Sequence, residues 1–328
     1  MPVPITTGTV LHDRYQVKKI IGQGGMGCIY LADDLRLEGR LCAVKEVEYD
    51  RALPPEVLKE ARDQFEMEAT VLGRLDHPNL PKVSDFFSID DRDYLVMDFV
   101  PGRDLRELMM EAHQNDVFLP EEDVLDWASQ IADALKYLHS QDPSIVHRDI
   151  KPSNLKLMPS GLVKLVDFGL VKLLAPGEVT ITVLQGQGTA LYTPLEQYGG
   201  DSRHTDARSD IYALGGTLYH LLTNQPPTNV RERFLNPGSL PKVRELNPEV
   251  SVRTERAIHW ALELHPEDRP ADTDTFIKAL FLEDAPVTKP YRNGYQQPRL
   301  IRKAERILIA LAGSLMAFSL LLTLLRNF

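Results

Sequence analysis

Apolar and polar residues alternate along the first part of the chain. From Tyr15 to Val47 the alternation runs between glycine-rich turns, which is typical of an antiparallel sheet with a buried face. Helical spacing follows over residues 56–75, directly after Pro54 and Pro55, and proline is tolerated in the first turn of a helix. Residues 94–102 then predict a buried strand that leads into a turn. The first hundred residues therefore predict a small antiparallel sheet with one main helix.

The pattern beyond residue 102 is mainly helical. Apolar residues recur at helical spacing from Val124 to Leu138, and the segment from Ile211 to Leu222 is apolar enough to form a buried helix. A small sheet followed by helices predicts an α+β fold. Residues 1–14 show no periodic pattern and no apolar run of signal-peptide length, so we expect them to form an extended lead-in.

A third pattern occupies residues 307–325, which are nineteen residues without a charge. At about 1.5 Å per residue such a helix spans about 30 Å, the hydrocarbon thickness of a bilayer. A helix packed on the body would instead show a polar face, and this segment has only scattered Ser and Thr. Arg302, Lys303 and Arg306 precede it, which places the body on the cytoplasmic side. We therefore predict a single-pass helix in the cell membrane, after a basic linker over residues 284–306.

Small residues lie on one face of this predicted helix. Gly313 and Ala317 have the small-xxx-small spacing that lets membrane helices pack closely, so the tail could pair two copies of the chain as a homodimer. Small residues are also common in spans that stay single. The sequence leaves both interpretations open.

Charge divides the chain in the same region. The net charge is −10 at pH 7 over 328 residues. From residue 285 onward, seven Lys or Arg stand against Glu305, a net +6, which leaves −16 for residues 1–284. An acidic body gives no reason to expect a nucleic-acid partner, because such proteins present a basic face. The acidic body would favour basic protein substrates or simply keep the protein soluble, and the basic tail suits an anionic membrane surface.

The chain has two cysteines, Cys28 and Cys42. Two are too few for a disulfide framework, so we expect a reducing compartment. Because they lie on neighbouring predicted strands, a redox contact between them is one interpretation and ordinary strand packing is the other.

The candidate chemistry is concentrated in one short stretch. His147-Arg148-Asp149-Ile150-Lys151-Pro152-Ser153-Asn154 is followed by Asp167-Phe168-Gly169. Asp149 can accept a hydroxyl proton, while Asn154 and Asp167 supply the hard oxygen ligands that Mg²⁺ prefers. A base beside two metal ligands indicates phosphoryl transfer.

A glycine-rich loop, Gly22-Gln23-Gly24-Gly25-Met26-Gly27, lies upstream, and its glycines let backbone N–H groups approach phosphates closely. A Walker loop would carry Gly-Lys-Ser/Thr directly after the glycines, whereas Lys45 comes eighteen residues after Gly27. A dinucleotide fold would open a helix there, whereas Cys28 to Ala32 has the pattern of a strand. Both classes of nucleotide site are therefore excluded.

In this order along the chain the motifs resemble the signature set of the protein kinase family, and most of all its bacterial serine/threonine members. The other matching segments are Ala43-Val44-Lys45 and Pro194-Leu195-Glu196. The resemblance implies a two-lobed protein kinase fold over residues 15–283, with an N-lobe over residues 15–97 and a C-lobe over residues 102–283. It also implies ATP with Mg²⁺ or Mn²⁺ as cofactors, and Ser or Thr hydroxyls of proteins as substrates.

The resemblance implies a role for each motif residue. Lys45 would bind the α- and β-phosphates of ATP and be oriented by Glu68, while Lys151 would stabilise the γ-phosphate. Met97 would be the gatekeeper beside the nucleotide. The residues expected to contact ATP are Ile21, Gly22, Gly24, Gly25, Gly27, Ile29, Ala43, Lys45 and Met97.

Regulation is implied by the long segment between the Asp-Phe-Gly and Pro-Leu-Glu motifs, because long loops often carry switches. A phosphate that the kinase itself adds to Thr180 or Thr182 would be captured by Arg148 and order the loop. Glu196 is expected to pair with Arg269 of a later motif.

Three residues depart from the family's pattern. Leu191 and Leu195 stand where many relatives have Gly and Pro, which leaves the shape of the peptide groove open. Lys156 occupies the position whose apolar side chain usually packs under the adenine, which leaves the affinity for ATP open.

Two other functions stay as alternatives, namely a catalytically silent pseudokinase that scaffolds a partner and a nucleotide-regulated interaction module.

Overall fold

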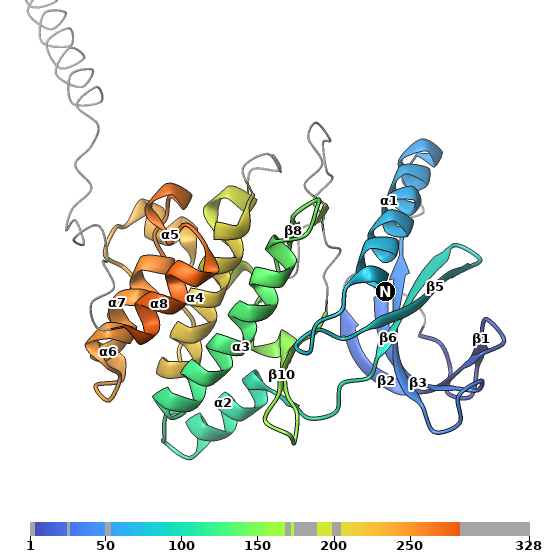
Figure 1. The fold of residues 1–328 in the computed structure, drawn as a ribbon, viewed down its shortest axis with the longest axis horizontal. Coiled ribbons are helices and arrows are strands. Elements are labelled where there is room, and N and C mark those ends of the chain that lie inside the picture. The colour runs from blue at the N-terminus through green and yellow to red at the C-terminus, as the bar shows by residue number, and fades with distance from the viewer. Residues whose placement is uncertain are drawn as a thin grey trace, which may run out of the picture. The chain divides into compact units, whose positions relative to one another are not determined.

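The computed structural model describes residues 4–24, 27–49, 54–167, 172–173, 189–198 and 205–282. The elements of the N-terminal lobe are β1 (Val10–Leu11), β2 (Tyr15–Gly24), β3 (Gly27–Asp34), β4 (Leu41–Glu48), α1 (Pro55–Arg74), β5 (Val83–Ile89) and β6 (Arg92–Asp98). The strands form one antiparallel sheet in the order β1-β2-β3-β4-β6-β5. Helix α1 packs against β5 and β6 (Figure 1). This is the small sheet with one main helix that the alternation predicts.

The two faces of the sheet have separate cores because successive side chains of a strand point to opposite sides. Tyr30, Val44 and Val96 belong to a cluster within the N-terminal lobe. Ala43 and Leu95, which alternate with them, belong to the larger cluster that continues into the helical lobe. One face of the sheet is therefore the face turned toward the rest of the molecule.

The two cysteines lie on β3 and β4, and both are free and buried. Cys42 is paired with Ala32, so Cys28 lies four positions away along β3, roughly 13 Å at the rise of a strand. Burial raises the pKa of the Cys42 thiol to about 11. A redox contact between the two thiols is excluded, and strand packing explains both.

The start of the chain is more ordered than an extended lead-in. Val10 and Leu11 pair with β2, and the backbone N–H of Ile5 donates to the hydroxyl of Tyr30 at 3.0 Å. Arg14 forms a bidentate ion pair with the buried carboxylate of Asp34. Its Nε and Nη2 atoms lie 2.8 Å from Oδ1 and Oδ2, respectively. A strand of two residues is too short to produce a readable period, so the sequence pattern missed it.

Helix α1 begins where the proline pair predicts, with Pro54 at the N-cap and Pro55 in the first turn. Its buried face carries Phe65, Ala69 and Leu72 at helical spacing. Glu68 lies on the same face and is only 4% exposed. A buried carboxylate needs hydrogen-bond donors, and Gln64 Nε2 supplies one at 2.7 Å.

The second lobe is mainly helical, and its central helices contain the two segments that the pattern predicts as helical. The helices are α2 (Leu105–Gln114), α3 (Glu121–His139), α4 (Ala207–Thr223), α5 (Val230–Leu235), α6 (Val243–Leu246), α7 (Val252–Ala261) and α8 (Thr273–Phe281). Helix α3 contacts α4 and α8, and α7 packs on α4 (Figure 1). Side chains that accept from the first free N–H groups start several of them, among them Asp104, Ser251 and Asp272.

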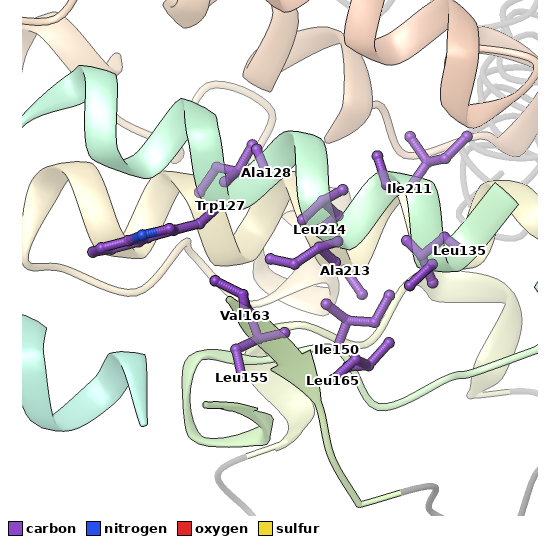
Figure 2. Packing of buried hydrophobic residues seen from close by; sticks show 14 of the residues in the cluster. Trp127, Ala128, Leu135, Ile150, Leu155, Val163, Leu165, Ile211, Ala213 and Leu214 are labelled. Carbon is purple, nitrogen blue, oxygen red and sulfur yellow. The ribbon is translucent and has the colours of Figure 1, made fainter. Parts of the chain in front are cut away.

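A small hairpin lies against this helical core. Its strands are β9 (Leu155–Leu157) and β10 (Val163–Leu165), with β7 (Arg103–Asp104) on the other edge of β9, and a second small sheet pairs β8 (Ile145–Val146) with β11 (Lys172–Leu173). Figure 2 shows Ile150 and three hairpin residues in one cluster with Leu135 of α3 and Leu214 of α4. The hairpin residues are Leu155, Val163 and Leu165. Apolar side chains thus fix both ends of the segment that joins Ile150 to the hairpin.

No helix in the described ranges, the last of which ends at residue 282, has both the length and the apolar character to cross a membrane. The basic linker over residues 284–306 and the predicted span over residues 307–325 lie outside these ranges. Membrane insertion of the tail therefore stays a prediction.

Candidate active site

Asp149 is held by residues that follow it in the same loop, residues 147–154, which is called the catalytic loop. Lys151 Nζ donates to Asp149 Oδ2 at 2.9 Å, and Asn154 Nδ2 donates to the same oxygen at 2.9 Å and to the Asp149 carbonyl at 2.8 Å. A short 3₁₀ turn over Pro152–Asn154 brings the two donors to the carboxylate. The other carboxylate oxygen, Oδ1, is buried and has no hydrogen-bond partner among the described residues. One carboxylate oxygen of Asp149 is therefore fixed, and the other can accept a hydrogen bond from a ligand.

Asn154 and Asp167 lie at one end of the β9–β10 hairpin. Asn154 directly precedes β9, Asp167 follows β10 by two residues, and the N–H of Val166 donates to the Asn154 carbonyl at 2.8 Å. Antiparallel pairing thus brings together two side chains that are thirteen positions apart in the sequence. Because Nδ2 of Asn154 is directed at Asp149, its Oδ1 is the atom that could ligate a cation.

Lys45 reaches Asp167 from the sheet. Its ammonium forms an ion pair with Asp167 Oδ1, which connects β4 of the N-terminal lobe to the hairpin of the helical lobe. The Lys45 charge, the largest cause, holds the pKa of Asp167 below its usual range, although burial acts in the opposite direction. Asp167 has a φ of 60°, a left-handed conformation that non-glycine residues rarely adopt. The ionised carboxylate and the strained backbone mark Asp167 as a functional candidate.

Four of the expected nucleotide contacts share one face of the sheet. Ile29 pairs with Lys45 across β3 and β4, and Ala43 pairs with Met97 across β4 and β6. Residues directly opposite each other, and residues two apart on one strand, point to the same side. This is the face that continues into the core of the helical lobe. The structure therefore gathers Ile29, Ala43, Lys45 and Met97, while Glu68 lies buried on α1.

The glycine loop joins β2 to β3, and Gly24 pairs with Gly27 at its tip. Gly27 has a φ of 142°, and a Cβ there would lie 2.2 Å from the carbonyl oxygen of Glu46. No other residue fits this position, because the hairpin approaches β4 too closely. Ile21 and Gly22 lie near the end of β2, while Gly25 lies outside the described residues.

Asp210, which the sequence patterns did not indicate, organises the start of the catalytic loop. Its carboxylate is fully buried in the first turn of α4 and accepts from the backbone N–H groups of His147 and Arg148 at 2.9 and 2.8 Å. His139 Nε2 lies 2.8 Å from the same carboxylate. Arg148, with a φ of 67°, is held in its left-handed conformation by these contacts. The sequence feature that could have indicated Asp210 is a carboxylate in the first turn of a mainly apolar helix.

The later motif residues form a buried ion pair. Arg269 Nη1 and Nη2 lie 2.6 and 2.9 Å from the two carboxylate oxygens of Glu196, and the guanidinium stacks over the ring of Tyr212 at 4.8 Å. Ser209 Oγ also donates to Glu196 at 2.7 Å. The pair anchors the segment after the long loop to the helical core.

All three departures can be located, whereas the two regulatory threonines cannot. Leu191 ends a short 3₁₀ turn over Thr189–Leu191 and is half-buried. Lys156 lies on β9, and its ammonium donates to the carbonyl of Gly102 at 3.3 Å, in the turn after β6. Leu195 packs at the edge of the main core. Thr180 and Thr182 lie outside the described residues.

Comparison with known proteins gives relatives over most of the chain. A family model described as protein kinase domain matches residues 15–281. The chain is 34% identical to the probable serine/threonine-protein kinase PknB of Corynebacterium glutamicum over 276 residues, which cover 79% of this chain and 40% of that protein. It is 34% identical to serine/threonine-protein kinase PrkC of Bacillus subtilis over 287 residues, which cover 83% of this chain and 42% of that protein. The chain thus spans about two fifths of the length of these relatives.

Two solved structures share the fold. The Mycobacterium tuberculosis PknI kinase domain matches with a TM-score of 0.63 and 27% identity, covering 84% of this chain and 98% of that one. The apo form of PpkA-294 matches with a TM-score of 0.67 and 26% identity, covering 84% of this chain and 99% of that one. Because the family model and these relatives cover most of the sequence, and the two-lobed fold is shared, the chain belongs to the protein kinase family.

Proposed function

We propose that this protein is a serine/threonine kinase that transfers the γ-phosphate of ATP to hydroxyl groups of proteins. The observation that carries the proposal is the carboxylate of Asp149, whose Oδ2 is fixed by Lys151 and Asn154 while its buried Oδ1 has no partner among the described residues. A buried acceptor without a donor favours a ligand that supplies one. The hydroxyl of a substrate would do so, and Asp149 would orient it and accept its proton.

The donor atoms beside Asp149 fit a divalent cation. The amide oxygen of Asn154 and the carboxylate of Asp167 are hard oxygen ligands at the same end of the hairpin, which suits Mg²⁺ and also Mn²⁺. When bound, the cation neutralises charge on the phosphates of ATP. Lys45, already directed at Asp167, would hold the α- and β-phosphates. Lys151 would approach the γ-phosphate from its position on Asp149.

The choice of a hydroxyl acceptor is supported by the sequence of the loop and by the relatives. Lys151 followed by Pro152 resembles the serine/threonine class rather than the tyrosine class. PknB and PrkC carry serine/threonine kinase names. Together they favour serine and threonine as acceptors.

Activation by phosphorylation of the long loop is part of the proposal. The Nε and Nη2 atoms of Arg148 are buried and have no hydrogen-bond partner within the described ranges, and burial lowers the pKa of this guanidinium. A buried cation without a partner is costly, so a phosphate on Thr180 or Thr182 would stabilise it and order the loop. Autophosphorylation would supply that phosphate.

We also propose that residues 307–325 anchor the kinase in the cell membrane with its catalytic body in the cytoplasm. The support is the length of the uncharged segment and the cations that precede it.

A pseudokinase or an interaction module would show nucleotide binding without phosphate transfer.

The decisive experiment incubates the purified protein with labelled ATP, Mg²⁺ and a mixture of basic and acidic test proteins. We expect Ser/Thr phosphate from the wild type, and a loss of at least about a thousandfold in kcat for Asp149→Asn, because the amide cannot accept the proton. Asp123→Asn, an equal change of charge on an exposed residue of α3, is the matched control and should keep full activity. Binding of ATP by the wild type without any transfer would instead establish the pseudokinase.

A further inference from the structure

A buried hydrogen-bond network ties the start of the chain to β4 of the N-terminal sheet. Glu46 on β4 is 1% exposed, and both of its carboxylate oxygens have partners. Arg92 of β6 donates from Nη1 to Oε1 at 2.6 Å, and Tyr30 of β3 donates from its hydroxyl to Oε2 at 2.7 Å. The Tyr30 hydroxyl also accepts from the backbone N–H of Ile5 at 3.0 Å. Three strands and the N-terminal segment therefore meet at one buried carboxylate.

The protonation of Tyr30 fixes the direction of the hydrogen bonds in this network. The side chain is fully buried, and burial raises the pKa of its hydroxyl above the usual range. The hydroxyl therefore keeps its proton, which it donates to Glu46, while its oxygen accepts from the N–H of Ile5. A phenylalanine at this position would deprive a buried carboxylate oxygen and a backbone N–H of this partner, which costs free energy.

The network lies on the face of the sheet opposite the expected nucleotide contacts. Tyr30 pairs with Val44 and belongs to the cluster within the N-terminal lobe, whereas Ile29 pairs with Lys45 on the other face. Successive residues of a strand point to opposite faces, so the Glu46 side chain points away from the face that carries Lys45. Tyr30 can therefore act on the nucleotide site only through the backbone of β4.

The backbone of Glu46 adjoins two parts of the candidate nucleotide site. Lys45 directly precedes it in β4, and its carbonyl lies against Gly27 at the tip of the glycine loop. A Cβ at Gly27 would lie 2.2 Å from this carbonyl oxygen, so the loop hairpin and β4 are in close contact. Because these groups are closely packed, a shift of β4 at Glu46 would move the glycine loop and Lys45 together.

We propose that Tyr30 is a positioning residue for ATP, which holds Glu46 and thereby keeps the glycine loop and Lys45 in the geometry that binds the phosphates. The N-terminal segment supports Tyr30 in this role, because the N–H of Ile5 completes the hydrogen bonds of its hydroxyl. This role rests on the proposed kinase function and extends the ATP site to residues outside every sequence motif. It also gives a function to the ordered start of the chain.

The test measures nucleotide binding and turnover separately on the full-length chain. Calorimetry gives the dissociation constant of a non-hydrolysable ATP analogue with Mg²⁺, and phosphotransfer assays give KM and kcat for ATP. We expect Tyr30→Phe to raise both the dissociation constant and KM about fivefold, the effect of one lost hydrogen bond on binding. At saturating ATP, kcat should stay within about twofold, because Asp149 and its donors belong to the other lobe.

Tyr15→Phe is the matched control for a merely structural role. Tyr15 is fully buried in the same cluster, and its hydroxyl donates to Asp85 Oδ2 at 2.7 Å. Asp85, however, lies on β5 at the edge of the sheet, two strands away from β4. Both variants lose a buried tyrosine hydroxyl, and both should lower the unfolding temperature. Only Tyr30→Phe should weaken nucleotide binding.

A second variant tests the N-terminal segment and does not depend on the folding of Tyr30→Phe. Ile5→Pro removes the N–H that donates to Tyr30 and leaves the bond between Tyr30 and Glu46 in place. We expect it to raise the dissociation constant about twofold by itself and to add nothing in the Tyr30→Phe background, because both changes act on one network. Ile5→Val keeps the N–H and should bind the nucleotide like the wild type.

The outcomes separate the role of Tyr30 from the function on which it rests. Unchanged nucleotide binding in a folded Tyr30→Phe, or equal weakening in Tyr15→Phe, would overturn the role of Tyr30 and leave the kinase proposal intact. Independent effects of Ile5→Pro and Tyr30→Phe would overturn the support by the N-terminal segment. Calorimetry needs no phosphate transfer, so a wild type that binds the nucleotide and transfers nothing would overturn the kinase proposal alone. Absence of nucleotide binding by the wild type would overturn both.

Discussion

Asp149 and Asp167 are both carboxylates of the candidate site, yet their surroundings prepare them for different tasks. Asp149 is fixed through one oxygen and presents the other without a partner in the described part of the chain. Asp167 faces the Lys45 ammonium, which holds its pKa below the usual range. A proton acceptor and a permanently ionised cation ligand are the two carboxylate roles that phosphoryl transfer requires.

We expect Asp167→Asn to abolish phosphate transfer, with kcat reduced by at least about a thousandfold. The substitution removes the charge that would hold the divalent cation and leaves Lys45 without its anionic partner at this position. Phosphotransfer assays over a range of Mg²⁺ concentrations provide the measurement, and thermal unfolding checks that the variant is folded. Most of the wild-type activity in a folded variant would contradict the assignment of Asp167 to the metal.

At the scale of elements, α4 links the helical core to the catalytic loop. Asp210 lies in its first turn and accepts from two consecutive backbone N–H groups of the loop, those of His147 and Arg148. The rest of the helix is buried and packs against α3 and α7, so its first turn is held in place by the core. The buried carboxylate at the head of α4 therefore fixes the backbone from which Asp149 projects.

We expect Asp210→Asn to lower the free energy of unfolding by about 3 kcal/mol and to reduce kcat as well. The amide has one acceptor oxygen in place of two and carries no charge, so a buried N–H of the loop loses its partner. Urea unfolding and phosphotransfer assays provide the two measurements. Asp123→Asn on the exposed face of α3 is the matched control and should alter neither.

The same variant has a defined pH dependence. Burial tends to raise the pKa of Asp210, but the hydrogen bond and charge of His139 outweigh it and hold the pKa below the usual range. Because the folded pKa lies below the unfolded one, this stabilisation is present above pH of about 4 and is lost as the pH falls through the folded pKa. The stability difference between wild type and Asp210→Asn should therefore shrink as the pH falls below about 4. A difference that grows in acid would contradict this assignment.

At the scale of the whole molecule, the two lobes share one hydrophobic cluster and several polar contacts. Two of these polar contacts are the Lys45–Asp167 ion pair and the hydrogen bond from the N–H of Leu165 to the carbonyl of Asn79 at 2.8 Å. Both contacts join the N-terminal lobe to the hairpin that carries the candidate metal ligands. Binding of ATP at this place would therefore act on both lobes.

The tail is expected to affect activation through concentration. If residues 307–325 confine the kinase to a membrane, the effective concentration of one copy for the loop of another rises. We expect the full chain in liposomes to phosphorylate Thr180 and Thr182 at least about tenfold faster than a chain ending at residue 300, at equal bulk concentration. Mass spectrometry of the loop provides the measurement.

A second variant separates anchoring from pairing of the tails. Gly313→Leu keeps the segment apolar but fills the face on which Gly313 and Ala317 lie. A slow Gly313→Leu chain in liposomes would indicate a specific dimer, whereas a fast one would indicate an anchor alone. Equal rates for the full and shortened chains would show that the tail has no part in activation.

The sequence by itself determined the main elements around the site and the set of candidate chemical groups. The alternation of Tyr15 to Val47 and the helical spacing of α1, α3 and α4 are local patterns, and local periodicity follows directly from the geometry of strands and helices. The motif order also identified Asp149, Asn154 and Asp167 as the candidate base and metal ligands, because these residue types are the ones that the chemistry needs.

Only the tertiary structure decided which groups meet. The contact between Asp210 and the N–H of Arg148 joins residues 62 positions apart, and the ion pair between Lys45 and Asp167 joins residues 122 positions apart. No spacing in the sequence encodes these contacts, because they depend on how the elements pack around the shared core. The candidate chemistry of the site could therefore be predicted from the chain, whereas its structural support came from packing.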